Sequence, residues 1–410
     1  MTFRHLLAAA ALALPAHAFA ADAATATATV AQWRGPDRSG ILPADALPDS
    51  FPEDGPKKVW SHATGIGYAT PVAAGGKVYF FYLKDGSDFL EAVDLNTGAS
   101  VWKQSYPNAF SNPGDFPGSR CTPVVEGDRI YTYGGNGELI ARQTSDGKQI
   151  WRLDVLSETG GSNKKWGIAS TPLIDGDRLY VQGGEGGNAA VAVSKADGKF
   201  VWKSQAKGGG YATPVLTTAG GKRQLICFAH DTLYSLDPAT GATLWEQKGP
   251  WEVEYNINAS MPIVSGDKVF VTHAYKNAQG VCFQITATGA TKLWGGKQVT
   301  GRFQPGVLDD GTLYVNSEGT VKAVNFADGK VLWSERANLG MGGSLLRAGD
   351  KLLMLTERGK AILARATPQK YTRLATFDAA EGKQVWASPL VADGKLIVKG
   401  ETEAVCYQLK

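Results

Sequence analysis

Seven positions share one place in an internal repeat, three residues before a proline. They are Tyr68, Arg120, Ala169, Tyr211, Ala259, Arg302 and Trp386. Aromatic faces and guanidinium groups that converge on one axis stack on a planar ligand and pair with its anionic oxygens. If the repeats surround a central channel, these positions meet at one end of it. We therefore predict a ligand site at this channel mouth, formed by the two tyrosines and the two arginines. The alternative interpretation is structural: the same side chains fill a channel and satisfy strand ends.

A second candidate site lies where residues 251–258 interrupt the repeat with carboxylates, amides and aromatic rings. Glu252, Glu254 and Asn256 offer the oxygen ligands that a hard cation such as calcium prefers. These three residues are our predicted metal ligands. The alternative is that the segment is only a longer loop on one face of the molecule.

The histidines and cysteines indicate no further chemistry. The five histidines show neither a metal-ligand spacing nor a catalytic triad. The four cysteines lack a C-x-x-C pattern, so we expect buried apolar residues of strands, with a disulfide between Cys227 and Cys282 as the alternative. The cysteines are Cys121, Cys227, Cys282 and Cys406.

The repeat that must position these residues is marked by tryptophans. Their successive spacings are 42, 49, 51, 43, 49, 39 and 53 residues, close to the period of a four-stranded propeller blade. We predict that each tryptophan ends the fourth strand of a blade and that its indole ring packs structurally between neighbouring blades. The tryptophans are Trp60, Trp102, Trp151, Trp202, Trp245, Trp294, Trp333 and Trp386.

The strand pattern predicts the fold class and the way the ring closes. Most repeats begin with a proline, which cannot donate to a ladder and therefore places the first strand at the inner edge of a blade. Seven segments begin in this way and an eighth begins near residues 343–344, so we predict eight four-stranded antiparallel blades in an all-β propeller. The last repeat has three strands. We expect the N-terminal strand around residues 57–60 to complete this C-terminal blade.

Composition and the N-terminus predict where the chain is located. Residues 1–20 combine basic residues, an apolar run and a small-residue cleavage site, so we expect a signal peptide. Residues 21–56 form a leader and extended segment, mobile over residues 22–31, and residues 57–410 form a single propeller domain. The predicted location is the periplasm or the extracellular space. Scattered charge with a net value of +3 predicts no nucleic-acid partner, and no stretch is apolar enough to span a membrane. We expect a monomer.

The strand corners at residues 92–102 and 234–245 resemble the tryptophan-docking repeat of PQQ-like (quinoprotein-like) β-propellers, and the resemblance extends from about residue 57 to the end. The opening Trp33-Arg34-Gly35-Pro36 with Ser39-Gly40 looks like a branch of exported bacterial repeat proteins. Two relatives share this architecture: the BamB scaffold of outer-membrane assembly and the quinoprotein alcohol dehydrogenases.

The two relatives imply different functions. The dehydrogenases imply PQQ and calcium in an axial funnel, whereas the scaffold implies contact with another envelope or extracellular protein. This sequence lacks the adjacent cysteines of many such enzymes, so we expect a non-catalytic binding protein or scaffold, with a small ligand at the channel mouth as a further partner. It also lacks an anchor cysteine near the predicted cleavage site, which argues against membrane tethering of the scaffold. The alternative is a PQQ-dependent alcohol or sugar dehydrogenase.

Overall fold

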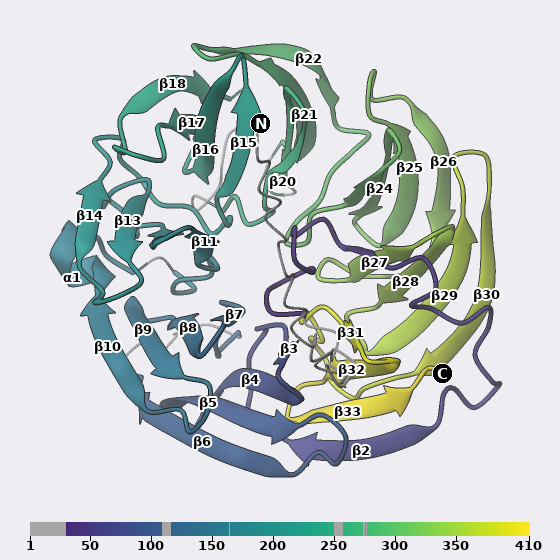
Figure 1. The fold of residues 1–410 in the computed structure, drawn as a ribbon. Coiled ribbons are helices and arrows are strands. Elements are labelled where there is room, and N and C mark those ends of the chain that lie inside the picture. Colours follow the sequence, from purple (N-terminus) through teal and green to yellow (C-terminus); the bar gives the residue numbers. More distant parts are fainter. Residues whose placement is uncertain (1–29, 109–115, 164, 250–256, 274, 276) are drawn as a thin grey trace, which may run out of the picture.

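The computed structural model describes residues 30–108, 116–163, 165–249, 257–273, 275 and 277–410. Within these residues the chain forms eight β-sheets arranged around one central axis (Figure 1). The four strands of each blade pair in antiparallel fashion, and the described part contains a single short helix, α1 (Val155–Thr159). The predicted all-β, eight-bladed propeller is confirmed.

The first four blades follow the chain. Blade 1 contains β3 (Val72–Ala74), β4 (Lys77–Lys84), β5 (Ser87–Asp94) and β6 (Ser100–Pro107). Blade 2 contains β7 (Val124–Glu126), β8 (Arg129–Tyr133), β9 (Glu138–Gln143) and β10 (Gln149–Asp154). Blade 3 contains β11 (Leu173–Asp175), β12 (Arg178–Val181), β13 (Val191–Ser194) and β14 (Phe200–Lys203). Blade 4 contains β15 (Val215–Ala219), β16 (Lys222–Ala229), β17 (Thr232–Leu236) and β18 (Thr243–Lys248).

The last four blades include two strands from the N-terminal part of the chain. Blade 5 contains β19 (Ile263–Ser265), β20 (Lys268–His273), β21 (Gln279–Ile285) and β22 (Ala290–Gly296). Blade 6 contains β23 (Val307–Asp309), β24 (Thr312–Ser317), β25 (Thr320–Asn325) and β26 (Val331–Arg336). Blade 7 contains β27 (Ser344–Ala348), β28 (Lys351–Leu355), β29 (Lys360–Ala366) and β30 (Tyr371–Asp378), with β1 (Ile41–Leu42) added to β27. Blade 8 contains β31 (Leu390–Ala392), β32 (Lys395–Lys399), β33 (Glu403–Gln408) and β2 (Lys58–Ala63).

Prolines precede the innermost strands, as expected for residues that cannot donate to a ladder. Pro71, Pro123 and Pro172 stand directly before β3, β7 and β11. Figure 1 shows β7 close to the axis and β10 at the rim of the same blade. The short inner strands therefore present their starting residues to the axis.

The ring closes through β2, which pairs antiparallel with β33. Trp60 lies opposite Cys406 and His62 lies opposite Ala404, so a strand from the N-terminal part supplies the outer edge of blade 8. The predicted closure by an N-terminal strand is confirmed. Without β2, the outer edge of β33 would be unpaired. The pairing of β2 with β33 therefore joins the two ends of the propeller domain in one sheet.

The eight tryptophans that mark the repeat all lie in the described part of the chain. Seven of them lie on the outermost strand of a blade. The Trp60 indole N–H donates to the carbonyl oxygen of Leu95 in blade 1, at 3.0 Å. A Cβ atom on Gly98, whose φ is +73°, would lie 2.7 Å from the Trp60 ring, so the corner of one blade closes directly on the ring of the other. The seven are Trp60, Trp102, Trp151, Trp202, Trp245, Trp294 and Trp333.

The prediction that Trp386 closes a fourth strand is wrong. β30 ends at Asp378, and Trp386 lies in the connection that follows. In the register of β30, Ala375 lies opposite Leu363 beside the bulge, which is the position that tryptophan takes in the other blades. The N-terminal segment packs here instead, because Phe51 meets Phe377 edge-on with ring centroids 5.1 Å apart.

The N-terminal segment crosses the propeller near its axis (Figure 1). Val30 exchanges two backbone hydrogen bonds with Ala73, at 2.9 and 3.0 Å, and the carbonyl of Ala31 accepts from the Val125 N–H at 2.8 Å. The predicted mobility is therefore wrong for these two residues. Residues 22–29 and the predicted signal peptide over residues 1–20 lie outside the described residues.

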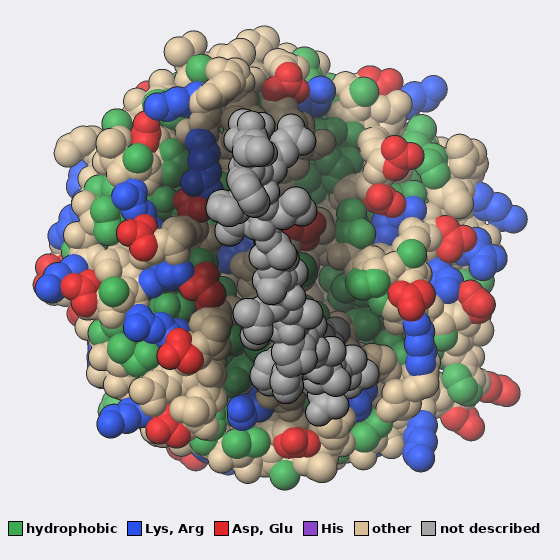
Figure 2. Space-filling view, in the orientation of Figure 1, with side chains coloured by type: hydrophobic (Ala, Val, Ile, Leu, Met, Phe, Trp, Pro, Cys, Tyr) green, Lys and Arg blue, Asp and Glu red, His purple; other side chains and the backbone are tan. Residues whose placement is uncertain are grey.

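The cysteines are buried and free, so the alternative of a disulfide between Cys227 and Cys282 is wrong. Cys227, Cys282 and Cys406 lie in β16, β21 and β33, as expected, whereas Cys121 precedes β7. On the face drawn in Figure 2, acidic and basic side chains are interspersed around the rim of the molecule. In the part of the chain that the structure describes, no helix is long and apolar enough to cross a membrane.

Candidate ligand pocket at the channel mouth

A chain of hydrogen bonds links neighbouring blades at the axis. The N–H of Thr70 donates to the hydroxyl of Thr122 at 3.2 Å, and Thr122 donates in the same way to Thr171 at 3.3 Å. Thr171 continues to Thr213 at 3.0 Å, and Ser388 donates to the Thr70 hydroxyl at 3.0 Å. We call these five residues the threonine belt. Each belt residue stands directly before a strand-opening proline, so the belt fixes the relative height of the residues just before it.

The seven positions three residues before a proline all line one cavity of about 280 Å³. The structure thus brings together the four predicted ligand residues, Tyr68, Arg120, Tyr211 and Arg302, with the remaining three positions of the set. Four residues of the belt also line the cavity. The remaining lining residues are Trp33, Phe116, Trp166, Ile257, Tyr275, Phe303, Gln304 and Met341.

One wall of the cavity is built around Trp386. Its ring centroid lies 4.8 Å from that of Tyr68, 5.3 Å from that of Phe116 and 4.9 Å from that of Phe303. We call these four residues the Trp386 wall. Behind it, a Cβ atom on Gly342 would lie 1.9 Å from Cδ1 of Trp386. The ring therefore occupies this position only because residue 342 has no side chain.

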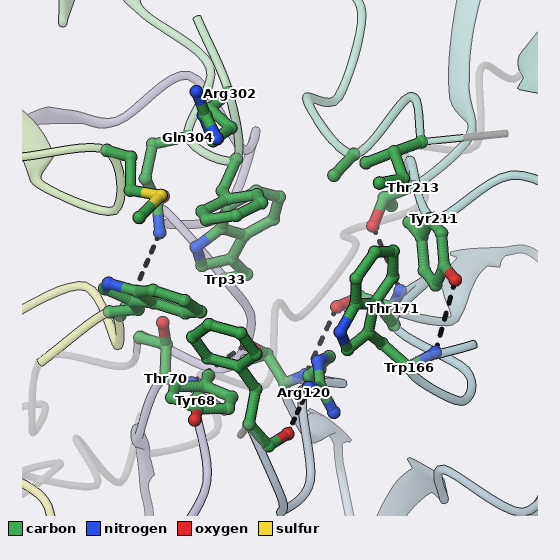
Figure 3. Close-up of a pocket in the computed structure, with 18 of the residues that line it drawn as sticks. Trp33, Tyr68, Thr70, Arg120, Trp166, Thr171, Tyr211, Thr213, Arg302 and Gln304 are labelled. Carbon is green, nitrogen blue, oxygen red and sulfur yellow. Dashed lines mark hydrogen bonds between the residues drawn. The ribbon is translucent and has the colours of Figure 1, made fainter. Parts of the chain in front are cut away.

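Trp166 and Tyr211 form a second aromatic group on the other side of Arg120 (Figure 3). Their ring centroids lie 6.2 Å apart, and the Trp166 N–H donates to the Tyr211 hydroxyl at 3.4 Å. Burial raises the pKa of Tyr211, so its hydroxyl stays neutral near pH 7. Arg302 lies across the pocket from Arg120, with its guanidinium 4.7 Å from the ring centroid of Tyr275.

The N-terminal segment contributes Trp33 to the pocket. Its indole N–H donates to the hydroxyl of Ser388, at 3.3 Å, which joins the segment to the threonine belt. The next residue, Arg34, is buried and donates to Pro305 and Gly306 in the connection to blade 6, at 3.2 and 2.7 Å. A segment that precedes the propeller repeats is therefore tied into the axis of the ring.

Arg120 contributes a positive charge to the pocket. Its guanidinium donates to the carbonyls of Gly118 and Phe116 and stacks over Tyr68, 5.1 Å from the ring centroid. Burial lowers the pKa of Arg120 to about 10, and burial raises the pKa of Tyr68 to about 12. Near neutral pH the arginine is therefore charged and the phenol is neutral, which makes the site cationic.

Sequence reasoning predicted the repeat-derived lining and missed the rest. Trp33, Phe116 and Trp166 lie outside the repeat, whereas Phe303 follows the predicted Arg302 at a repeat position that other blades fill with smaller residues. The predicted metal ligands Glu252, Glu254 and Asn256 lie outside the described residues. Within the described residues, no group of three His, Cys, Asp or Glu side chains is placed to hold a metal ion.

These observations define a class: an eight-bladed β-propeller with an aromatic, cationic pocket at one mouth of its axis. Residues 86–335 and 317–407 match the family described as "Outer membrane protein assembly factor BamB". The chain belongs to this family. No curated protein matches the sequence.

Solved structures share the fold at low sequence identity. BamB from Moraxella catarrhalis is 14% identical with a TM-score of 0.63, covering 86% of this chain and 99% of its own. The computationally designed Ika8 protein is 12% identical with a TM-score of 0.60, covering 86% and 99%. Quinohemoprotein alcohol dehydrogenase from Comamonas testosteroni is 13% identical with a TM-score of 0.50, covering 92% and 80%. At this identity the likeness concerns the fold alone.

Proposed function

We propose that this protein is an exported, non-catalytic binding protein whose recognition site is the pocket at the channel mouth. The pocket itself carries the proposal: aromatic side chains and two guanidinium groups line a cavity of about 280 Å³. Apolar concavities with a few placed polar groups are typical of recognition sites. Membership of a family described as an assembly factor supports a binding role.

We further propose that the protein acts in the periplasm or outside the cell. The predicted signal peptide over residues 1–20 supports export, as does the family description, which refers to the outer membrane. The partner is another envelope or extracellular protein, or a small ligand, that presents an aromatic group to the pocket. We expect a monomer that binds no nucleic acid.

A PQQ-dependent dehydrogenase is the second candidate, favoured by the flat aromatic surfaces at the axis. The Trp386 wall and Arg120 suit a planar, carboxylated quinone, which they would hold by stacking and by paired hydrogen bonds. Such a cofactor would supply the redox chemistry. The described lining contains no Asp or Glu to hold the accompanying calcium ion.

One experiment separates the two candidates. Purified protein is incubated with PQQ and calcium and assayed with alcohols and sugars in the presence of an artificial electron acceptor. We expect no sustained dye reduction above the control without protein. Turnover that depends on added PQQ would contradict the binding proposal and support the dehydrogenase.

A second experiment tests whether the pocket is the recognition site for a protein partner. Immobilised wild type, Trp386→Ala and Val101→Ala are compared for retention of proteins from an envelope extract. Val101 is a suitable control because it lies on β6 with 47% of its surface exposed, away from the pocket lining. We expect a stoichiometric partner to be retained by the wild type and the control and lost by Trp386→Ala. Equal retention by all three would place the contact elsewhere.

A further inference from the structure

The two arginines of the pocket differ in their partners. Arg302 donates to both carboxylate oxygens of Glu318, at 3.3 and 3.2 Å, so its charge is already paired. Arg120 forms no ion pair within the described residues and donates to the carbonyls of Gly118 and Phe116. Neutral carbonyls satisfy its hydrogen bonds, and no carboxylate among the described residues pairs with its positive charge. Arg120 is thus the cation that an anionic ligand group would meet.

The surroundings of Arg120 favour a ring next to that anionic group. Tyr68 lies under the guanidinium and packs against Trp386, while Trp166 stands on the other side (Figure 3). Because Arg120 is partly buried beside aromatic side chains, a carboxylate paired with this guanidinium is attracted more strongly than at an open surface. A volume of about 280 Å³ suits a small ligand with one or two fused rings.

We propose that the pocket binds an aromatic monocarboxylate, with its carboxylate on Arg120 and its ring packed on the Trp386 wall. The proposal rests on the proposed function, since it assumes that the pocket is a recognition site. A single anionic group is specified because Arg302 is committed to Glu318. The proposal thereby narrows the predicted planar anion to a ligand with one charge at a defined end of the pocket.

The charge requirement is tested with two probes of the same shape. Purified wild-type protein is titrated by calorimetry with 2-naphthoate and with its neutral counterpart, 2-naphthamide. We expect the carboxylate to bind about tenfold more tightly or better, as for a charge-assisted pair compared with a neutral contact. Equal affinity would overturn the proposal and leave an aromatic recognition pocket. Failure of both probes to bind would contradict the recognition pocket as well.

Matched arginine variants locate the anion. Arg120→Gln should lower the affinity for 2-naphthoate about tenfold and change that for 2-naphthamide by less than about twofold, whereas Arg302→Gln should leave both within about twofold. Arg120→Lys should restore part of the preference for the acid, because it keeps the charge. Equal weakening of both probes by Arg120→Gln would show a structural role. Loss of the acid preference in Arg302→Gln alone would place the anion at the other arginine. Either result would overturn the proposal.

Discussion

At the scale of single residues, the position of the Trp386 ring depends on a glycine behind it. Substitution Gly342→Ala places a Cβ atom 1.9 Å from Cδ1 of Trp386, so the ring must move toward the pocket or the backbone must shift. We expect the free energy of unfolding to fall by about 1–3 kcal/mol and 2-naphthoate binding to weaken. Thermal melts and calorimetry measure both effects.

The matched control is Gly289→Ala. An added Cβ atom at Gly289 meets no atom within 4 Å, and its φ is not in the left-handed region. We expect unchanged ligand affinity and a change in stability below about 0.5 kcal/mol. If Gly342→Ala behaved like this control, the Trp386 wall would be looser than the structure indicates.

A buried carboxylate next to the ring closure sets part of the pH dependence of stability. Burial by itself would raise the pKa of Glu91, but the hydrogen bonds that it accepts outweigh burial and lower the pKa from 4.5 to about 2. Its donors are His62, Tyr82, Ser100 and Lys103. Because the folded pKa is depressed, the stability contributed by this group is present above pH 4.5 and is lost as the pH falls toward about 2.

We therefore expect Glu91→Gln to be about 1–3 kcal/mol less stable than the wild type at pH 7, with the difference shrinking below pH about 4.5. Denaturant unfolding at several pH values measures this. Asp88 in the same strand provides the comparison. Hydrogen bonds from Ser119, Asn108 and Tyr106 lower its pKa, but burial outweighs them and the net pKa is raised. For a raised carboxyl pKa the sign reverses, so Asp88→Asn should gain stability relative to the wild type as the pH rises. The same sign in both variants would contradict these assignments.

At the scale of elements, the N-terminal segment acts as part of the propeller although it precedes every blade. β1 extends blade 7 in parallel pairing with β27, and Arg34 joins the segment to the connection before blade 6. The tight approach of Gly40 to the Arg34 guanidinium explains why glycine stands at this position: a Cβ atom there would lie 2.5 Å from Nη2. The segment from Trp33 to Gly40 is therefore held in a fixed conformation that places Trp33 at the axis.

Arg34→Lys tests this role. Arg34 donates to four backbone carbonyls, which belong to Arg38, Ser39, Pro305 and Gly306. A lysine cannot span them in the same fork geometry, so we expect a loss of about 2–4 kcal/mol and weaker 2-naphthoate binding as Trp33 is released. The exposed Arg336→Lys serves as the control and should change neither quantity. Full ligand affinity in Arg34→Lys would show that the segment does not position Trp33.

The strands themselves were the most predictable elements. Proline, glycine turns and apolar alternation act locally, so the sequence indicated the inner strands and their order around the ring. The tryptophan position was predicted for seven blades and misassigned in blade 7, where Ala375 stands opposite Leu363. The final spacing of 53 residues, the longest of the series, was the sign that Trp386 belongs to a connection.

At the scale of the whole molecule, stability depends on closing the ring. Trp60 on β2 is buried against blade 1 and donates to Leu95, whereas its neighbour Val59 is 37% exposed. We expect Trp60→Ala to lower the free energy of unfolding by about 3–5 kcal/mol and Val59→Ala by less than about 0.5 kcal/mol. Thermal and denaturant melts compare the two. Equal stability would mean that β2 contributes little to closure.

The sequence by itself determined the architecture, because each blade repeats local signals: strand-opening prolines, glycine corners and docking tryptophans. It also determined which repeat positions meet at the channel mouth, since rotational symmetry brings equivalent residues to one ring. The tertiary structure alone decided which further side chains line the pocket and how they pack. Trp33 reaches the axis through contacts with distant blades, Trp386 packs against Gly342, and Glu318 pairs with one arginine and not the other. Such contacts join residues far apart in the chain and follow no period, so no local pattern encodes them.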